Sequence, residues 1–275
     1  MTPPVAYPGP PGSHTATAAA ALHPSDPLVP LAGFRAVADA VVSAEAGHGV
    51  LPIESSLAGA VAETHDLLYE RALSIVGETV LPIRHCLAAT APVPLEDLRI
   101  VRSHPMALDQ CRELLASLPH AKVIMSSTTA EAAQHVAEDG DPTEAAIVGA
   151  EAVELYGLTV LKDDVSDSPA YTRFVSIAPY TRIDRVQAAR TAFTFATHHK
   201  PGALHAAIEP FARAGLDLVR LVSRPLPATP WKYRFDAVVI GHPLEPAVRI
   251  ALQELEAATR ELRIVGVYEG HEEQA

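Results

Sequence analysis

One short segment places two side chains together that could act on an acidic small molecule. It reads Ser168-Pro169-Ala170-Tyr171-Thr172-Arg173-Phe174, and it lies after a turn and ahead of an apolar run. A guanidinium can hold a carboxylate through two parallel hydrogen bonds, so Arg173 is a candidate carboxylate ligand. The neighbouring hydroxyl of Thr172 can donate or accept a proton at the same molecule. A structural alternative for Arg173 is an ion pair with a nearby acid such as Asp167.

Further polar residues fall where apolar runs give way to helical patterns. Ser55, Ser56, Ser103 and Thr129 each lie at an expected strand-to-helix junction. Ser and Thr are preferred N-caps, and a helix N-terminus also attracts anions. A capping role and an anion-binding role are therefore both open for these four residues.

The elements that must position these residues form two blocks. In the first, from residue 5 to about 180, apolar runs alternate with helical patterns. This alternation predicts an α/β layer fold with parallel strands, in which ligands lie at the carboxyl ends of strands. The expected strands include 49–53, 99–101 and 145–148, and the expected helices include 34–46, 106–117 and 129–138.

The second block, from about 190 to 269, predicts the ferredoxin-like order β-α-β-β-α-β. Its clearest strand is 231–240, where apolar and polar residues alternate from Trp231 onward. The join between the blocks is expected within 179–190. The other expected elements are strands 191–197, 216–222 and 262–268 and helices 202–214 and 243–260.

Composition narrows the class of protein. A chain of 275 residues suggests two domains, and no apolar run approaches the roughly 18 residues needed to cross a membrane. The N-terminus lacks the basic region of a signal peptide, which predicts a cytoplasmic protein. The net charge of -12 argues against nucleic acid as a partner. Cys86 and Cys111 are expected to be buried reduced thiols, and the 13 His show no metal-ligand spacing.

Six segments follow one another in a fixed order along nearly the whole chain, roughly from residue 5 to residue 269. They are Gly9-Pro10-Pro11-Gly12-Ser13-His14-Thr15, Pro52-Ile53-Glu54-Ser55-Ser56, Ser103-His104-Pro105 with Gln110, Glu154-Leu155-Tyr156-Gly157-Leu158, Thr172-Arg173-Phe174, and Lys200-Pro201-Gly202-Ala203-Leu204 with Ser223-Arg224-Pro225. In this order and spacing the chain resembles prephenate dehydratase with a C-terminal ACT regulatory domain.

The resemblance implies a fold and a domain organisation. It implies a two-lobed α/β catalytic domain, periplasmic-binding-protein-like, over residues 5–180, followed by a ferredoxin-like βαββαβ ACT domain over 190–269. Lobe one would comprise about 5–80 plus 162–180, and lobe two about 81–161. It also implies a homodimer or homotetramer that needs no cofactor and responds to a small amino acid, with phenylalanine as the family's effector.

The resemblance further implies decarboxylating dehydration of prephenate to phenylpyruvate in phenylalanine biosynthesis. Thr172 would serve the departing hydroxyl, Arg173 a carboxylate, and Glu54 would orient backbone groups or act as an acid. Ser103 and Gln110, seven residues apart, are expected on one helical face beside the cleft. Phe174 is expected in the core. The substrate-binding candidates are Ser13, Thr15, Ser55 and Ser56, and the effector-binding candidates are Gly202, Ala203, Leu204, Ser223 and Arg224.

Four positions depart from the family pattern. Ser55 replaces an Asn of the binding site, and Ala170 stands about where an Asn usually precedes the Thr-Arg-Phe motif; the chain contains no Asn at all. Val222 replaces a Glu of the phenylalanine-sensing motif, and His199 replaces an Asp. These changes predict weak or absent regulation by phenylalanine. Two alternatives to prephenate dehydration are an arogenate dehydratase or another prephenate-processing relative, and a non-catalytic ligand-sensing module.

Overall fold

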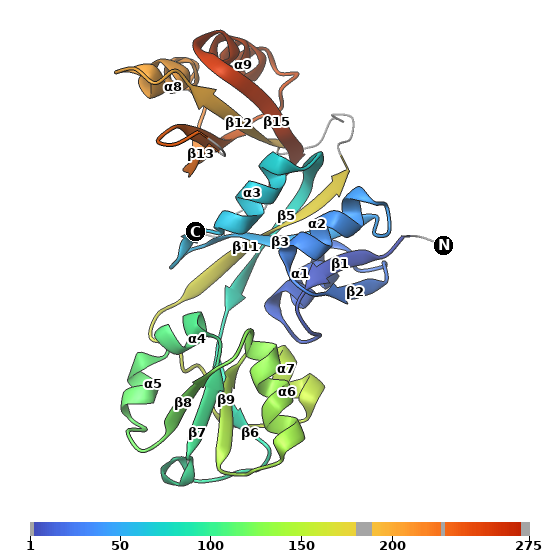
Figure 1. Cartoon of the computed structure of the whole chain (residues 1–275), viewed down its shortest axis with the longest axis vertical. Coiled ribbons are helices and arrows are strands. Elements are labelled where there is room, and N and C mark those ends of the chain that lie inside the picture. The colour runs from blue at the N-terminus through green and yellow to red at the C-terminus, as the bar shows by residue number, and fades with distance from the viewer. Residues whose placement is uncertain (1–2, 180–188, 227–228, 271–275) are drawn as a thin grey trace.

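Three bodies follow one another along the long axis of the molecule, as Figure 1 shows. The computed structural model describes residues 3–179, 189–226 and 229–270. Lobe one lies in the middle and holds β1–β5, α1–α3 and β11; lobe two holds β6–β10 and α4–α7; the C-terminal domain holds β12–β15, α8 and α9. The expected α/β class is confirmed. Within the described residues, no helix is long and apolar enough to cross a membrane.

Lobe one is built on a mixed sheet with the order β5-β11-β3-β1-β2. β1 runs parallel to β2 and β3, whereas β11 runs antiparallel to both β3 and β5. The expected parallel strands are present in β1, β2 and β3, but the sheet is mixed, because β5 leads the chain toward lobe two and β11 brings it back. The elements are β1 (Val5–Pro8), α1 (His14–Leu22), β2 (Leu28–Leu31), α2 (Phe34–Val42), β3 (His48–Ser55), β4 (Gly59–Ala60), α3 (Ala62–Glu70), β5 (Leu73–Ile83) and β11 (Ala170–Pro179).

Helices cover both faces of this sheet. Ala18 and Ala19 of α1 pack on one face in a cluster that contains Phe174, which is 2% exposed and so belongs to the core as expected. On the opposite face, α2 and α3 pack against Val175 and Ile177. Because side chains alternate along a strand, these two clusters fix which way each residue of β11 points.

Lobe two has its own five-stranded sheet in the order β10-β6-β9-β7-β8. The helix expected over 106–117 is two short helices, α4 and α5, because the Asp167 carboxylate accepts hydrogen bonds from the backbone N–H groups of Arg112 and Glu113 and starts a new helix there. The elements are β6 (Cys86–Ala89), a 3₁₀ turn (Leu95–Asp97), β7 (Ile100–Ser103), α4 (Pro105–Asp109), α5 (Arg112–Ala116), β8 (Lys122–Met125), α6 (Thr129–Asp139), β9 (Glu144–Val148), α7 (Ala150–Tyr156) and β10 (Thr159–Lys162).

Both cysteines of lobe two are free and buried, as expected. Burial raises the pKa of the Cys86 thiol to about 11 and that of Cys111 to about 12. Neither thiol is therefore a reactive nucleophile at neutral pH.

The C-terminal domain has the antiparallel strand order β13-β14-β12-β15, which is the ferredoxin-like order expected. Phe193, Phe195 and Phe211 lie in its core with residues of α8 and α9. Trp231 does not begin a strand, because it has φ of 63° and is 83% exposed. Most of the expected join at 179–190 lies outside the described residues. The elements are β12 (Ala189–Thr197), α8 (Ala203–Arg213), β13 (Leu218–Pro225), β14 (Tyr233–Ile240), α9 (Pro246–Ala258) and β15 (Thr259–Glu269).

The C-terminal domain sits directly against lobe one. Gly266 of β15 pairs in parallel with Ile75 of β5, so the two sheets join into one of ten strands. A Cβ at position 266 would lie 2.3 Å from the carbonyl oxygen of Ile75, so this approach requires glycine. The regulatory candidate and the catalytic candidate are therefore in backbone contact.

Candidate functional site

Thr172 and Arg173 point to opposite faces of the lobe one sheet. β11 pairs with β5 without interruption from Ala170 to Ser176, so its side chains alternate regularly. Thr172 therefore lies on the α1 face with Phe174, whereas Arg173 lies on the other face and donates a 3.0 Å hydrogen bond to Glu78. This corrects the expectation that the two neighbours would act on the same molecule, since the two-residue period of the strand separates them.

Ser55 lies beside Thr172 on the adjacent strand. The two residues are in register between β3 and β11, so their side chains share the α1 face. Among the residues that the structure describes, the Thr172 hydroxyl has no protein hydrogen-bond partner, and the residue is half-buried. Its hydroxyl is thus available to a ligand at this place.

Ser55 and Ser56 lie in a tight turn between β3 and β4 rather than at a helix start, which corrects the expected junction. Ser55 Oγ accepts from the backbone N–H groups of Leu57 and Ala58 at 3.4 and 3.3 Å. Ser56 Oγ accepts from the Tyr171 N–H at 2.9 Å. The Ser55 hydroxyl therefore stabilises the turn itself, and the Ser56 hydroxyl ties the turn to β11, one residue before Thr172.

The loop before α1 closes against lobe two. The Tyr156 hydroxyl donates to the Pro11 carbonyl at 3.2 Å, and a Cβ on Gly12 would lie 3.2 Å from Ala152 Cα. Ser13 is the N-cap of α1, where its Oγ accepts from the Ala16 N–H at 3.2 Å. The capping role is therefore the one observed for Ser13, and half-buried Thr15 lies in the first turn of the same helix.

A second helix N-terminus approaches the same gap from lobe two. Thr128, rather than the expected Thr129, is the N-cap of α6, and its methyl group would lie 3.8 Å from a Cβ on Gly9. The loop ahead of α1 and the N-terminus of α6 thus lie close together across the lobes. A helix N-terminus carries partial positive charge, so the starts of α1 and α6 together favour an anionic ligand in this cleft.

Two histidines outside the sequence-based candidates meet where the lobes join, one from α1 and the other from the segment between β5 and β6. The rings of His14 and His85 are 5.9 Å apart between centroids. His85 Nε2 donates to Gln110 Oε1 at 3.1 Å, because an amide oxygen can only accept. Only two weak features of the sequence could have pointed to this pair: His14 lies in the Gly-rich segment, and His85 lies shortly after a strand.

Ser103 and Gln110 do not share a helical face, which corrects the expectation from their spacing. Ser103 ends β7, is fully buried, and donates to the Ile147 carbonyl at 2.6 Å. The helix begins only at Pro105, and Gln110 is the residue at which α4 ends. Gln110 remains the candidate from lobe two because its hydrogen bond to His85 holds it at the cleft.

Arg173 is held by two carboxylates. Its Nη1 donates to Glu78 Oε1, and its Nε lies 3.4 Å from Glu54 Oε2. The Glu78 side chain is only 1% exposed and also pairs with Arg190 from β12. Of the two interpretations of Arg173, the ion pair is therefore the one observed, with Glu54 and Glu78 as partners in place of Asp167.

The five effector-binding candidates do not meet within one chain. Gly202, Ala203 and Leu204 line a cavity of about 630 Å³ at the start of α8. Arg224 lies elsewhere, because its guanidinium donates two hydrogen bonds, 3.2 and 2.6 Å long, to the Asp66 carboxylate of α3. Ser223 pairs with Phe235 on the sheet between these places.

The neutral state of His85 predicts loss of stability in acid. Burial, with a smaller effect of His14, lowers its pKa from 6.5 to about 4, although the hydrogen bond to Gln110 opposes this. The unfolded chain therefore binds more protons than the folded one between pH 6.5 and 4, and stability falls as the pH falls through this window. At 1.36 kcal/mol per pKa unit, the loss is about 3 kcal/mol.

Urea unfolding at pH 7, 5.5 and 4 checks this prediction. His85→Gln should lose less stability over the window than the wild type, and His120→Gln, at an exposed position, is the matched control. Equal slopes for all three proteins would contradict the assignment of a buried neutral imidazole at position 85.

Comparison with known proteins identifies the family of the chain. A family model described as prephenate dehydratase matches residues 5–181. The bifunctional chorismate mutase/prephenate dehydratase of Escherichia coli (strain K12) is 33% identical over 270 residues, covering 96% of this chain and 70% of that protein. The arogenate dehydratase/prephenate dehydratase 2 of Arabidopsis thaliana is 34% identical over 275 residues, covering 96% of this chain and 72% of that protein.

Solved structures extend the likeness to the C-terminal domain. A prephenate dehydratase from Arthrobacter aurescens in complex with L-Phe superposes with a TM-score of 0.88 at 30% identity, covering 97% of this chain and 90% of that one. GqqA, described as a novel type of quorum quenching acylase, also gives 0.88, at 33% identity over 97% of this chain and 98% of that one. The chain belongs to the prephenate dehydratase family.

Proposed function

We propose that the protein catalyses the decarboxylating dehydration of prephenate to phenylpyruvate. The observation that carries this proposal is the Thr172 hydroxyl, which has no hydrogen-bond partner among the described residues and lies beside Ser55 on the α1 face of the sheet. The N-termini of α1 and α6 supply the positive potential that a dianionic substrate needs. Family membership over residues 5–181 supports the same reaction.

The residues of the cleft divide the chemistry between them. As the bond to the ring carboxylate breaks and carbon dioxide leaves, its electron pair moves into the ring and the C–O bond breaks; the departing hydroxide takes up a proton from solvent and so leaves as water. Thr172 supplies the hydrogen bond to that hydroxyl; its own hydroxyl is far too weak an acid to ionise at pH 7. Gln110, held by neutral His85, supplies a second polar contact from lobe two. The helix N-termini hold the second carboxylate.

A turnover assay separates this proposal from its alternatives. Prephenate should be consumed and phenylpyruvate should accumulate, followed by its absorbance in alkali, whereas arogenate should react more slowly. Faster turnover of arogenate would identify an arogenate dehydratase. Prephenate binding without any product would identify a ligand-sensing module.

Acyl amide hydrolysis is a second candidate function, and the likeness to GqqA over nearly the whole chain favours it. The same preparation should be incubated with an N-acyl amine, and the released carboxylic acid measured. Release that survives in Thr172→Ala would place this activity outside the cleft described above.

Ser55→Asn is expected to retain or raise activity on prephenate. Ser55 shares the α1 face with Thr172, and its hydroxyl serves the turn rather than a second side chain, so a longer amide can reach into the cleft. Steady-state kinetics with prephenate and arogenate on wild type and variant check this. A shift of preference toward arogenate would mean that the pocket is remodelled, and identical constants would mean that position 55 lies outside the site.

Phenylalanine is expected to bind weakly. None of the described residues lining the cavity at Gly202–Leu204 is an acid, so within one chain the ligand's ammonium meets no carboxylate there. Leaving a buried ammonium unpaired costs several kcal/mol, more than the 1–3 kcal/mol typical of effector coupling. Calorimetric titration to millimolar phenylalanine, with Val222→Glu as the gain-of-binding variant, checks this. Micromolar binding by the wild type would contradict it.

A further inference from the structure

The face of the lobe one sheet opposite the cleft carries a network of charges that continues into the C-terminal domain. Glu54 is in register with Arg173, and the next residue, Ser55, is in register with Thr172. Glu54 therefore sits on the same backbone as the turn that faces the cleft, although its carboxylate points the other way. A contact that fixes the Glu54 side chain therefore also restricts the backbone position of Ser55.

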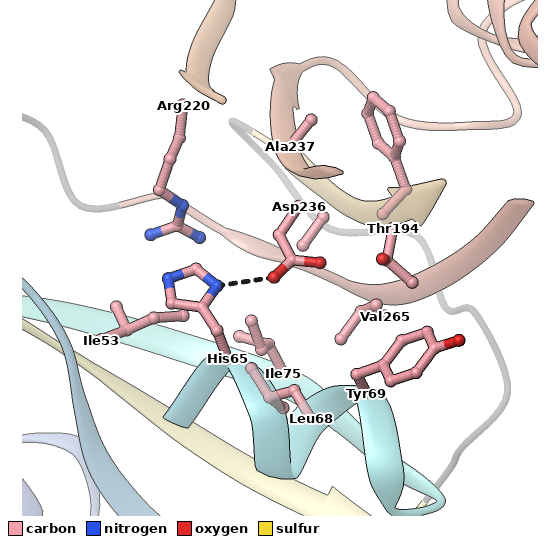
Figure 2. Close-up of a pocket in the computed structure, with 12 residues that line it drawn as sticks. Ile53, His65, Leu68, Tyr69, Ile75, Thr194, Arg220, Asp236, Ala237 and Val265 are labelled. Carbon is pink, nitrogen blue, oxygen red and sulfur yellow. Dashed lines mark hydrogen bonds and ion pairs between the residues drawn. The ribbon is translucent and has the colours of Figure 1, made fainter. Parts of the chain in front are cut away.

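A C-terminal domain cation reaches Glu54. Arg220 Nη1 lies 3.9 Å from Glu54 Oε2, and the Arg220 side chain is 8% exposed against 36% for Glu54. Figure 2 shows the guanidinium extending from β13 toward lobe one, beside the His65 ring of α3. A cation this deeply buried is stabilised by a nearby anion, and Glu54, whose Oε2 also lies 3.4 Å from Arg173 Nε, is a carboxylate within ion-pair range.

Three further contacts hold β14, and with it the paired strand β13, over lobe one. His65 Nδ1 and Asp236 Oδ2 are 3.0 Å apart across the domain contact, as the dashed line in Figure 2 shows. Arg234 is 1% exposed and donates to the His65 carbonyl and to Asp66 at 3.1 and 2.8 Å. Arg220 therefore approaches Glu54 from a rigid platform rather than from a free strand.

The hydrogen bonds around the turn show what this contact could control. Val61 N–H donates to the Ile53 carbonyl and Ser56 N–H donates to the Tyr171 carbonyl, each at 2.9 Å. One of these bonds lies on each side of Glu54, and the bond from Ser56 ties the turn to β11. A shift of Glu54 would strain them first and then move Ser55 relative to Thr172.

We propose that Arg220 is a positioning residue of the dehydratase: from the C-terminal domain it holds Glu54, and so holds Ser55 and Thr172 in the geometry needed for turnover. The C-terminal domain is then part of the support of the active site, and any movement of β13 changes turnover through Glu54. This inference rests on the proposed function only for its kinetic readout.

Kinetics give the first test. Arg220→Met should lower kcat about 10- to 100-fold with KM within about threefold, because misplacement of a catalytic group by about 1 Å has effects of this size. Arg220→Lys, which keeps the charge, should stay within about threefold of wild type. Once Glu54→Gln has been introduced, adding Arg220→Met should cause no further loss. Wild-type kcat in Arg220→Met, or losses that multiply in the double variant, would overturn the proposal.

Hydrogen exchange gives a second test that needs no activity. Arg220→Met and Glu54→Gln should both speed exchange at the Ser56 and Val61 amides and leave the β7 and β9 amides of lobe two unchanged. Arg249→Met, on an exposed position of α9, is the matched control. If the wild type does not convert prephenate, the proposed function is wrong, but the exchange data still decide whether Arg220 positions the turn through Glu54. Unchanged exchange at Ser56 and Val61 would overturn it.

Discussion

Replacing Thr172 with alanine is expected to lower kcat on prephenate by at least about 100-fold while KM and the thermal midpoint change little. Loss of a proton donor or acceptor that acts in the transition state has an effect of this size. The hydroxyl has no partner among the described residues, so its removal breaks no protein hydrogen bond. The loss should therefore fall on the chemical step rather than on folding.

Two variants sharpen this result. Thr172→Ser keeps the hydroxyl and should recover most of the lost turnover. Tyr171→Phe removes a hydroxyl from the adjacent residue, which lies on the opposite face and is 50% exposed, so it should behave like wild type. Near-wild-type kcat in Thr172→Ala would remove Thr172 from the mechanism, and an equal loss in Tyr171→Phe would point to strand distortion.

The sequence predicted elements well where one face alone is apolar. Apolar and polar residues alternate over 233–237, and β14 forms there, although Arg234 and Val238 on its other face are also buried; the inward residues expected of α9, Val248, Ala251 and Leu255, are all buried. In β11, by contrast, Phe174, Val175, Ser176 and Ile177 are all buried because helices cover both faces. Because both faces of the strand are apolar, the sequence shows no alternation from which the face of each side chain could be predicted. The opposite orientations of Thr172 and Arg173 could therefore not be predicted from it.

The polar contacts of the site were harder to predict for a different reason. One sequence motif contains both Ser103 and Gln110. Whether the Ser103 hydroxyl faces a ligand or a neighbouring carbonyl, however, depends on the packing of β7 against β9. His85 and Gln110 meet across 25 residues, and Arg173 meets Glu78 across 95. No local spacing encodes such pairs, because they form only when separate elements pack.

Arg173→Met is expected to destabilise the protein by about 3 kcal/mol or more. The Glu78 side chain is 1% exposed, so loss of Arg173 removes one of the cations paired with a buried carboxylate. Turnover should fall as well, because Glu54 and the turn at Ser55 lose the same support. KM should rise no more than about threefold, since the guanidinium faces away from the cleft.

Comparing this variant with Arg173→Lys and with the double variant Arg173→Met/Glu78→Gln decides between the two roles of Arg173. Lys keeps the charge but not the fork that serves Glu54 and Glu78 together, so it should recover stability only in part. The double variant removes the buried charge along with Arg173, but it also takes the Glu78 carboxylate away from Arg190, so it should regain only part of the free energy of unfolding. A substrate clamp predicts the reverse pattern: KM raised at least tenfold in Arg173→Lys, with unfolding unchanged. Urea unfolding and steady-state kinetics on the same preparations therefore assign Arg173 either to the substrate or to the support of the strand that carries Thr172.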